Sequence, residues 1–448
     1  MRLKIQALIL LIGIMVLPAP IAGAQVKYFS LKEAQEYAIR NNYQARNAII
    51  DVALAAKKVK ENLATGLPQV DGSISYNNFL SLATQLIPAE FFGGEPGTYL
   101  EVQFGTKHNA SAQMQLSQLV YSGSYIVGLQ AAKEYVKLSK HQLEQVEQDV
   151  KQAIANSYYL VLVSQKNKEL MAKTISTMEK LLGDTQAMYK QGFMQDTDVD
   201  KLALLLSDLK TSVLNADNQL KNALSLMKFN LGMSISDEIQ LTDNLDLLLL
   251  AIDPRISMDE AFKLEDHVTF KLMEDQESLS EYQVKLARMA YLPTVSAFLS
   301  AQGNAQRNEF NFFDFNEKWF PTTLIGVQFA IPIFSSGNRL YKVQQASLEL
   351  EKIKNSRLQI NESLVMGAAT ARNNLEIAVE TYKNKKNSFS LASRIYDKEQ
   401  IKYKNGTSSS TDLNQSYNQL LESQGTFLGA TLDMLNKKLE LDKAYSKL

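Results

Sequence analysis

One short stretch occurs twice in this chain, and each copy lies between two long helical patterns. Residues 189–192 read Tyr-Lys-Gln-Gly, and residues 403–406 read Tyr-Lys-Asn-Gly. Glycine adopts turn conformations that other residues resist, and the Asp, Thr and Ser residues that follow are natural N-caps of a new helix. Each copy therefore predicts the bend of a helical hairpin, with one tip near Gly192 and the other near Gly406. Two copies indicate an internal duplication.

The helical patterns beside these bends are long and carry heptad repeats. From residue 124 to about residue 188 the helix breakers are Gly128 and Gly183. A helix of this length is typical of coiled coils rather than of globular domains. In the next helix, apolar residues recur seven apart in two rows: Val199, Leu206, Val213, Leu220 and Met227, with Leu202, Leu209, Ala216 and Ala223. The small residues in these rows favour broad helical sheets or barrels over a tight two-stranded zipper.

Strand-type alternation of apolar and polar residues precedes each long helix. It predicts strands at about 70–78 and 109–119 in the first half, and at about 294–302 and 322–331 in the second. A stretch rich in Phe, Gly, Pro and Asn, from about residue 79 to residue 108, reads as a long loop.

The two halves therefore share one order of elements. The first repeat covers residues 25–231 with its hairpin at 123–231, and the second covers 257–448 with its hairpin at 337–448. Residues 232–256 are expected to form a linker or equatorial segment.

Short motifs mark the same places in both halves. Residues 30–33 form a capping box at a helix start, and residues 257–260 match them. Ser-Gly turns at Gly123 and Gly337 are expected where the two long helices begin.

Composition excludes several classes of function. The net charge is -1, so no basic surface indicates nucleic-acid binding. The chain has no cysteine, which rules out disulfides and thiolate chemistry. Its three histidines, His108, His141 and His267, are far apart in sequence, which disfavours a metal site or a catalytic triad. We expect no cofactor, no metal and no enzymatic activity.

The first 24 residues have the features of a cleaved Sec-type signal peptide. Arg2 and Lys4 give the charged start, residues 5–17 are apolar but too short to span a bilayer comfortably, and residues 22–24 read Ala-Gly-Ala. The alternative is an uncleaved anchor. No later run of about 20 apolar residues predicts a transmembrane helix.

Four strands per chain would leave a sheet with two exposed edges. A closed membrane barrel needs about eight strands or more, so three copies of the chain, supplying twelve, would solve the problem. The predicted strands are long enough for a tilted bilayer crossing, in which every backbone group must be paired. The alternative is a soluble sheet in an exported globular protein.

The duplicated halves, the Leu-Pro turns at 67–68 and 292–293, the two Ser-Gly turns and the paired bends together resemble the bacterial outer-membrane efflux protein family, the TolC-type trimeric export channels. The resemblance implies a mostly α fold with a small β part. Two repeats of coiled-coil-like hairpins and four transmembrane strands per chain would trimerise into a twelve-stranded β-barrel continuous with an α-helical barrel. It also implies a passive conduit of a tripartite efflux or type I secretion system.

The same resemblance implies a location and partners. The chain would lie in the outer membrane, in contact with its lipid, with a large periplasmic extension. A periplasmic adaptor protein and an inner-membrane transporter would complete the machine. The competing hypothesis is an exported helical-hairpin adaptor or structural protein of the periplasm.

The resemblance also implies a docking role at the hairpin tips. Tyr189 and Gly192 in the first copy, and Tyr403 and Gly406 in the second, fall where the family's tips contact the adaptor. A bare glycine backbone allows another helical tip to approach closely. The alternative is an ordinary turn glycine.

Two aspartates match the family's acidic periplasmic aperture. Three copies of Asp198 and of Asp412 would focus a negative potential and attract cations. The alternative is helix N-capping. Ser408 stands where the family pattern has a locking arginine, and Gln415 where it has a further acid, so the family's gating details do not transfer directly.

Aromatic residues gather in and beside the loops between the strands. Those expected at the membrane boundary are Phe91, Phe92, Phe312, Phe313, Trp319 and Phe320. The alternative is packing of the loops on themselves.

Overall fold

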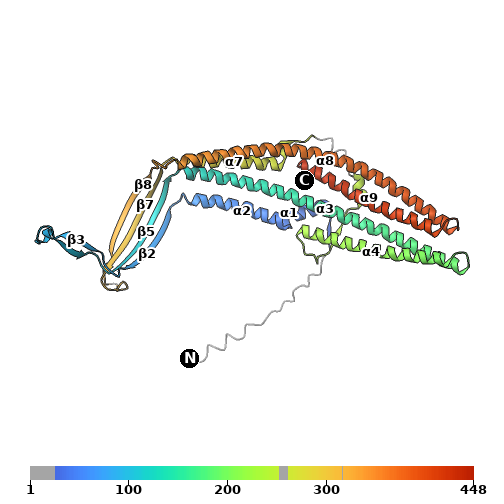
Figure 1. Cartoon of the computed structure of the whole chain (residues 1–448), viewed down its shortest axis with the longest axis horizontal. Helices are drawn as coiled ribbons and strands as arrows, with labels where there is room; N and C mark the ends of the chain where they lie inside the picture. Colours follow the sequence, from blue (N-terminus) through green and yellow to red (C-terminus); the bar gives the residue numbers. More distant parts are fainter. Residues whose placement is uncertain (1–25, 252–260, 315) are drawn as a thin grey trace, which may run out of the picture. The chain divides into compact units, whose positions relative to one another are not determined.

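The computed structural model describes residues 26–251, 261–314 and 316–448. These residues form two compact units, which are described separately. Unit 1 takes the described residues within Met1–Arg46, Glu147–Ala261 and Ala368–Leu448. Unit 2 takes Asn47–Val146 and Phe262–Gly367. The two longest helices, α3 (Gly123–Lys190) and α8 (Asn338–Lys404), contribute residues to both units (Figure 1).

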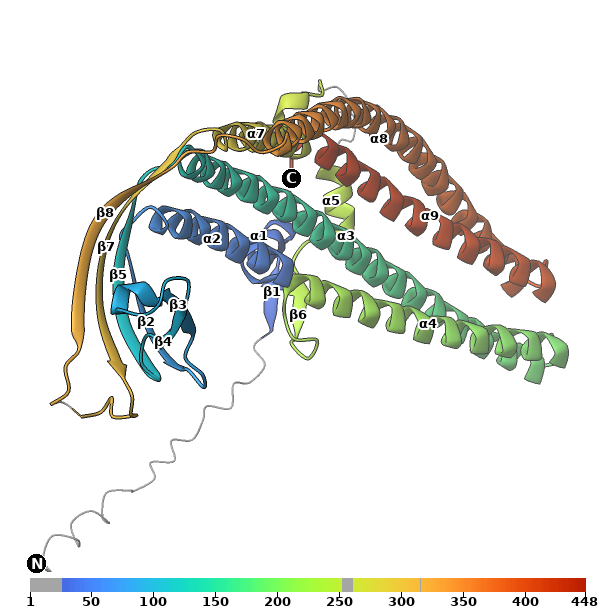
Figure 2. The same ribbon diagram turned by 60° about the vertical axis from the view of Figure 1, so that its left-hand side comes forward.

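Unit 1 is built from two helical hairpins. α3 is followed by α4 (Asp196–Leu231), and α8 is followed by α9 (Ser410–Ala444). Figure 2 shows the members of each pair side by side, with both connecting loops at the same end of the unit. One predicted heptad row of α4 is buried along its length: Leu202, Leu209, Ala216 and Ala223. The prediction of a mostly helical fold with long helix pairs and a small antiparallel sheet is confirmed.

An apolar core joins the two hairpins near their connecting loops. All four helices contribute to it, and its most buried members include Leu181, Leu202, Leu209, Tyr403, Leu413 and Tyr417. Each such side chain contributes about 2 kcal/mol when it leaves water. The hairpin ends are therefore held together by apolar packing as well as by their loops.

The start of the described chain is tied into unit 1. β1 (Lys27–Phe29) pairs in parallel with β6 (Ile239–Leu241). α1 (Leu31–Asn41) begins at the predicted capping box, in which the Glu33 carboxylate accepts a hydrogen bond from the backbone N–H of Ser30 at 2.8 Å. The matching residues 257–260 lie outside the described residues.

The segment expected as a linker contains regular structure. β6 is followed by α5 (Leu245–Ala251), and Asp243 lies between them. Its carboxylate accepts hydrogen bonds from the Tyr158 hydroxyl at 2.7 Å and from the backbone N–H of Leu31 at 3.0 Å. These bonds fasten the segment to α3 and to the start of α1.

Unit 2 contains a four-stranded antiparallel sheet in the order β2-β5-β7-β8 (Figure 1). The strands are β2 (Gln69–Asn78), β5 (His108–Tyr121), β7 (Thr294–Arg307) and β8 (Phe320–Ala330). β7 is longer than predicted, because Gly303 and Asn304, which favour turns, are paired with Ala112 and Ser111 of β5.

The prediction of a long loop after β2 is partly wrong. It contains a second, two-stranded antiparallel sheet made of β3 (Thr84–Pro88) and β4 (Tyr99–Gln103), with a 3₁₀ turn, η1 (Ala89–Phe92), between them. Strands this short, in a segment rich in Gly and Pro, leave no clear alternation in the sequence.

Helices complete unit 2. α2 (Tyr43–Ala64) lies mostly within it, and a 3₁₀ turn, η2 (Leu264–Asp266), precedes α7 (Val268–Met289). No helix within the described ranges combines the length and apolar character that a membrane span requires.

Candidate functional site

The two hairpin ends in unit 1 share one backbone design. At the end of α3, the N–H of Gly192 bonds to the Tyr189 carbonyl at 2.9 Å and the N–H of Phe193 to the Met188 carbonyl at 3.0 Å. Gly192 has φ 82°. This pair of bonds closes a helix with a left-handed residue, a conformation that glycine adopts without strain.

The end of α8 repeats the design. The N–H of Gly406 bonds to the Tyr403 carbonyl at 3.0 Å and the N–H of Thr407 to the Lys402 carbonyl at 2.9 Å, with φ 70° at Gly406. A Cβ atom placed on Gly192 or Gly406 would meet nothing within 4 Å. Both tips are thus open surfaces, and their glycines are required by the turn rather than by lack of space.

The two ends enclose a shallow pocket of about 490 Å³. Its lining includes both tip glycines, Asp198, Tyr403 and Ser408. The structure therefore brings together residues from both copies of the repeated stretch.

The two tip tyrosines have different environments. Tyr189 is 46% exposed, whereas Tyr403 is 1% exposed and packs in the core between the hairpins. Burial raises the pKa of the Tyr403 hydroxyl. Of the two side chains expected at a docking surface, the structure leaves that of Tyr189 accessible.

The two aspartates also differ. Asp412 belongs to a capping box of α9, in which its carboxylate accepts hydrogen bonds from the Ser409 hydroxyl at 2.7 Å and from the Ser409 backbone N–H at 3.4 Å. These bonds, the hydroxyl first, lower the pKa of Asp412. Asp198 is half-buried in the first turn of α4, whose N-cap is Gln195. Asp412 thus takes part in the capping box as its third residue, while the N-caps themselves are Ser409 for α9 and Gln195 for α4, so neither aspartate is an N-cap.

Polar contacts join the two hairpins next to the pocket. Lys404 Nζ lies 3.0 Å from Asp184 Oδ2, and Lys201 Nζ donates to Ser410 Oγ at 3.3 Å. Ser408 instead bonds to Glu399 within its own hairpin. The sequence did not single out Asp184, because an acid on a long charged helix carries no motif.

The glycines at the starts of the long helices have separate reasons for being glycine. Gly337 has φ 82°. Gly123 is the first residue of α3, and a Cβ there would lie 2.9 Å from the Met289 sulfur. A left-handed turn therefore requires glycine at position 337, and close packing against α7 requires glycine at position 123.

The aromatic residues beside the sheet divide into two groups. Phe312 packs edge-on against Tyr76, with ring centroids 5.7 Å apart, and lies under the Arg307 guanidinium at 5.2 Å. Trp319 is 6.5 Å from Phe312. The well-exposed group is Phe91, Phe92, Phe313 and Phe320. Phe312 packs against neighbouring residues, and Phe313 contacts the ring of Phe310 at a centroid distance of 6.1 Å although most of its side chain is exposed. The exposed side chains of Phe91, Phe92 and Phe320 can contact other molecules.

Unit 2 holds a buried charge cluster. Asp275 on α7 has a fully buried side chain whose oxygens lie 2.8 Å from Lys137 Nζ and 2.5 Å from His141 Nδ1, both on α3. The hydrogen bond to Asp275 raises the pKa of Lys137. Glu277, also on α7, pairs with Arg357 of α8 at 2.8 Å. α7 is therefore fixed to α3 and α8 by ion pairs.

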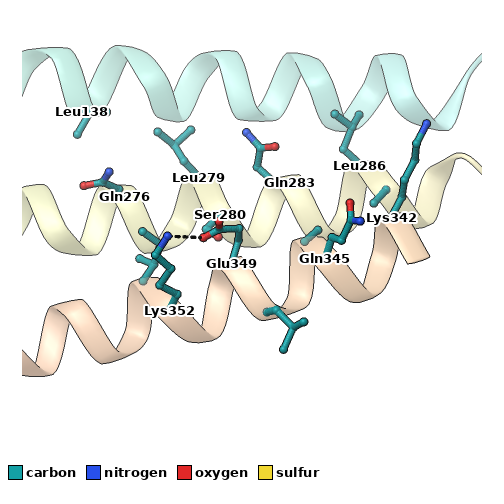
Figure 3. Close-up of a pocket in the computed structure, with 14 residues that line it drawn as sticks. Leu138, Gln276, Leu279, Ser280, Gln283, Leu286, Lys342, Gln345, Glu349 and Lys352 are labelled. Carbon is teal, nitrogen blue, oxygen red and sulfur yellow. Dashed lines mark ion pairs between the residues drawn. The ribbon is translucent and has the colours of Figure 1, made fainter. Parts of the chain in front are cut away.

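Unit 2 has a groove of about 980 Å³ between α3, α7 and α8 (Figure 3). Leu279, Gln283 and Leu286 line it from α7, and Lys352 pairs with Glu349 along α8 at 3.5 Å. Within the described chain, no group of three or more His, Asp or Glu side chains could hold a metal ion.

Comparison with known proteins gives consistent results. Residues 35–232 and 265–446 match the family model described as outer membrane efflux protein. The outer membrane protein TolC of Vibrio cholerae serotype O1 is 20% identical over 343 residues, which cover 75% of this chain and 77% of that protein.

Solved structures match the fold at low sequence identity. The CmeC outer membrane channel of Campylobacter jejuni aligns with a TM-score of 0.67 at 17% identity, over 93% of this chain and 85% of that one. The open state of the MtrE outer membrane channel of Neisseria gonorrhoeae aligns with a TM-score of 0.70 at 15% identity, over 93% of this chain and 88% of that one.

Proposed function

Because the chain belongs to the outer membrane efflux protein family, as a channel of the TolC type, we propose that it forms the outer-membrane conduit of a tripartite export machine. Channels of this family form trimers and are not enzymes. In this proposal a periplasmic adaptor passes cargo to the conduit from an inner-membrane transporter. Residues 1–24 would act as the signal peptide that exports the chain.

The sheet of unit 2 is the observation that carries the proposal. β2 and β8 are its outer strands, and neither has a further neighbour in the described sheet. Unpaired strand edges are costly in lipid, where water cannot satisfy them. Pairing of β2 in one copy with β8 in the next removes both edges, and three copies of four strands make a twelve-stranded barrel.

The hairpin ends are the proposed aperture. Asp198 lines the pocket between the two ends, and Asp412 is exposed beside it. Three copies of each would place carboxylates around a narrow opening, which favours cations. The Lys404–Asp184 ion pair would hold the two hairpins of one chain in the closed arrangement.

Membrane fractionation followed by measurement of the native mass tests the proposal. The expected result is a species of three chains that separates with the outer membrane and needs detergent for extraction. A monomer in the soluble periplasmic fraction would contradict it and support the alternative of a periplasmic hairpin protein.

Docking of the adaptor at the tips has its own test. Asn tolerates a left-handed backbone, so Gly192→Asn with Gly406→Asn adds two side chains to the tips with little strain. We expect normal trimers with reduced adaptor binding and reduced efflux. The matched control is Gly183→Asn with Gly429→Asn, two exposed helix glycines that also have open space around them. Unchanged adaptor binding in the tip variant would refute docking there.

A further inference from the structure

One face of the sheet in unit 2 is polar. The residues on that face can be identified from the pairing of residues between neighbouring strands. Residues paired across antiparallel strands point to the same side of a sheet. One row of paired residues consists of Ser73, Gln113, Gln302 and Thr322, taken from the four strands in order. The adjacent rows on this face continue mainly with Ser, Asn and Gln, and they also contain Phe298, Leu324 and Phe320.

The polar face is almost free of charge. Across β2, β5, β7 and β8 its sole acid or base is the exposed Asp71, in the row with Gln115 and Ser300. His108 and Arg307, the basic residues of these strands, are paired with each other and belong to the opposite face.

Hydrogen bonds organise these neutral side chains along the face. Gln113 Nε2 donates to Ser300 Oγ at 3.1 Å, and Gln302 Nε2 donates to Asn304 Oδ1 at 2.8 Å. Each amide retains donors and acceptors beyond these contacts, which water or a solute can use. The face therefore offers hydrogen bonds of both kinds without a net sign of charge.

The opposite face is mainly apolar, apart from His108 and Arg307 at one end of the strands. Its row next to Ser73 consists of Gly72, Met114, Ala301 and Thr323. Farther along, Ile74 and Ile325 are 87% and 79% exposed. Such a surface suits lipid, so that in a barrel made from this sheet the polar face must line the water-filled interior.

We infer that the polar face forms an almost uncharged wall of the conduit, on which Asp71 is the one residue of the four strands that can select ions by their charge. This inference rests on the proposed function. A wall of amides and hydroxyls favours neither sign, because these groups hydrogen-bond with cations, anions and neutral polar molecules alike. The conduit should therefore pass polar molecules and ions of either charge. Three copies of Asp71 add a modest preference for cations.

Two measurements on the full-length trimer in planar lipid bilayers test the inference. The first is the reversal potential in a potassium chloride gradient. Asp71→Asn, made in a channel that also carries Asp198→Asn and Asp412→Asn so that the proposed aperture adds no charge, should lower the ratio of potassium to chloride permeability about twofold to fivefold, the size expected for three partly screened charges. Asp71→Glu, which keeps the charge, should leave the ratio unchanged.

The second measurement uses single cysteines, for which the cysteine-free chain gives a clean background. The probes are two methanethiosulfonates, one cationic and one anionic, added to the water phase. A thiol in Gln302→Cys should react with both at rates that match within about twofold after normalisation to a free thiol. Ala301→Cys, adjacent but on the apolar face, should react about tenfold more slowly.

The outcomes separate the inference from the function on which it rests. A protein without conductance both as the wild type and as Lys404→Asp, which removes the proposed latch between the hairpins, would overturn both. A conducting channel would overturn the inference alone if Asp71→Asn left the permeability ratio of its parent channel unchanged. The same holds if the thiol at position 302 strongly preferred one reagent, or if the thiol at position 301 reacted as fast as that at 302.

Discussion

The carboxylate of Asp275 is fully buried in unit 2, where Lys137 and His141 of α3 contact its two oxygens. Removal of one partner from such a cluster leaves the others without compensation in a poorly hydrated place. This cluster could not be singled out from the sequence, because rows of charged residues on long helices are typical of solvated faces or of salt bridges between helices. Tertiary packing, rather than residue type, makes Asp275 important.

Asp275→Ala should loosen α7 locally. We expect the free energy of local unfolding of α7 to fall by about 2 kcal/mol. This is less than the usual cost of breaking a buried ion pair, because Lys137 can return to water. Hydrogen exchange of the α7 amides in the intact trimer should accelerate roughly thirtyfold. Glu134→Ala removes a weaker ion pair of the same Lys137, 3.4 Å long, and should change exchange much less. Equal effects of the two variants would contradict a special role for Asp275.

The buried tyrosines between the hairpins make the tip core sensitive to alkali. Burial raises the pKa of Tyr396 to about 12 and also raises that of Tyr417. Their stabilisation is complete below the pKa of an unfolded tyrosine, about 10, and is lost as pH rises through the folded value. Between these values the free energy of unfolding should fall by about 1.4 kcal/mol per pH unit for each tyrosine.

Thermal unfolding between pH 9 and pH 12 checks this expectation. Tyr396→Phe with Tyr417→Phe should flatten the alkaline fall in melting temperature while leaving the trimer folded at neutral pH. The control is Tyr189→Phe, because Tyr189 is the exposed counterpart of the buried Tyr403. This variant should keep the wild-type profile. A double variant as sensitive to alkali as the wild type would show that other groups cause the fall.

Helices and strands with long regular sequence patterns could be predicted, whereas short elements could not. The heptads on α4 predicted its buried row, since Leu202 to Ala223 repeat without a break. β1 and β6 have three residues each, which is too few to show a strand period in the sequence. Tertiary packing brings these two strands together. The duplication predicted equal roles for Tyr189 and Tyr403, whereas packing of the second hairpin buries only Tyr403.

The ion pair between the hairpins offers a test of how these elements move. Lys404 and Asp184 are 40% and 43% exposed, so the pair should be worth less than about 1 kcal/mol. Lys404→Asp should raise the open probability of single channels in lipid bilayers about twofold to fivefold, because two like charges then face each other. The swap of Lys404→Asp with Asp184→Lys should restore it. If the swap opened the channel as much as the single variant, the pair would not act as a latch.

At the scale of the whole molecule, the features of both units support assembly. Among the described residues, the two outer strands of the sheet in unit 2 have no further strand beside them, and the hairpins of unit 1 end in open, glycine-based tips. Neither feature stabilises an isolated chain. Both are expected in a protein that completes its fold with further copies and binds a partner at its tips.

Cross-linking of the outer strands tests the shared barrel most directly. Ser73→Cys on β2 is combined with a cysteine at each of three polar-face positions of β8 in turn, Thr322, Leu324 and Gln328. Oxidation in outer-membrane fractions should yield a covalent ring of three chains for at least one combination. Gln113→Cys on the inner strand β5, with the same partners, should yield none. Chains that stay monomeric in every combination would show that β2 and β8 of neighbouring copies do not pair.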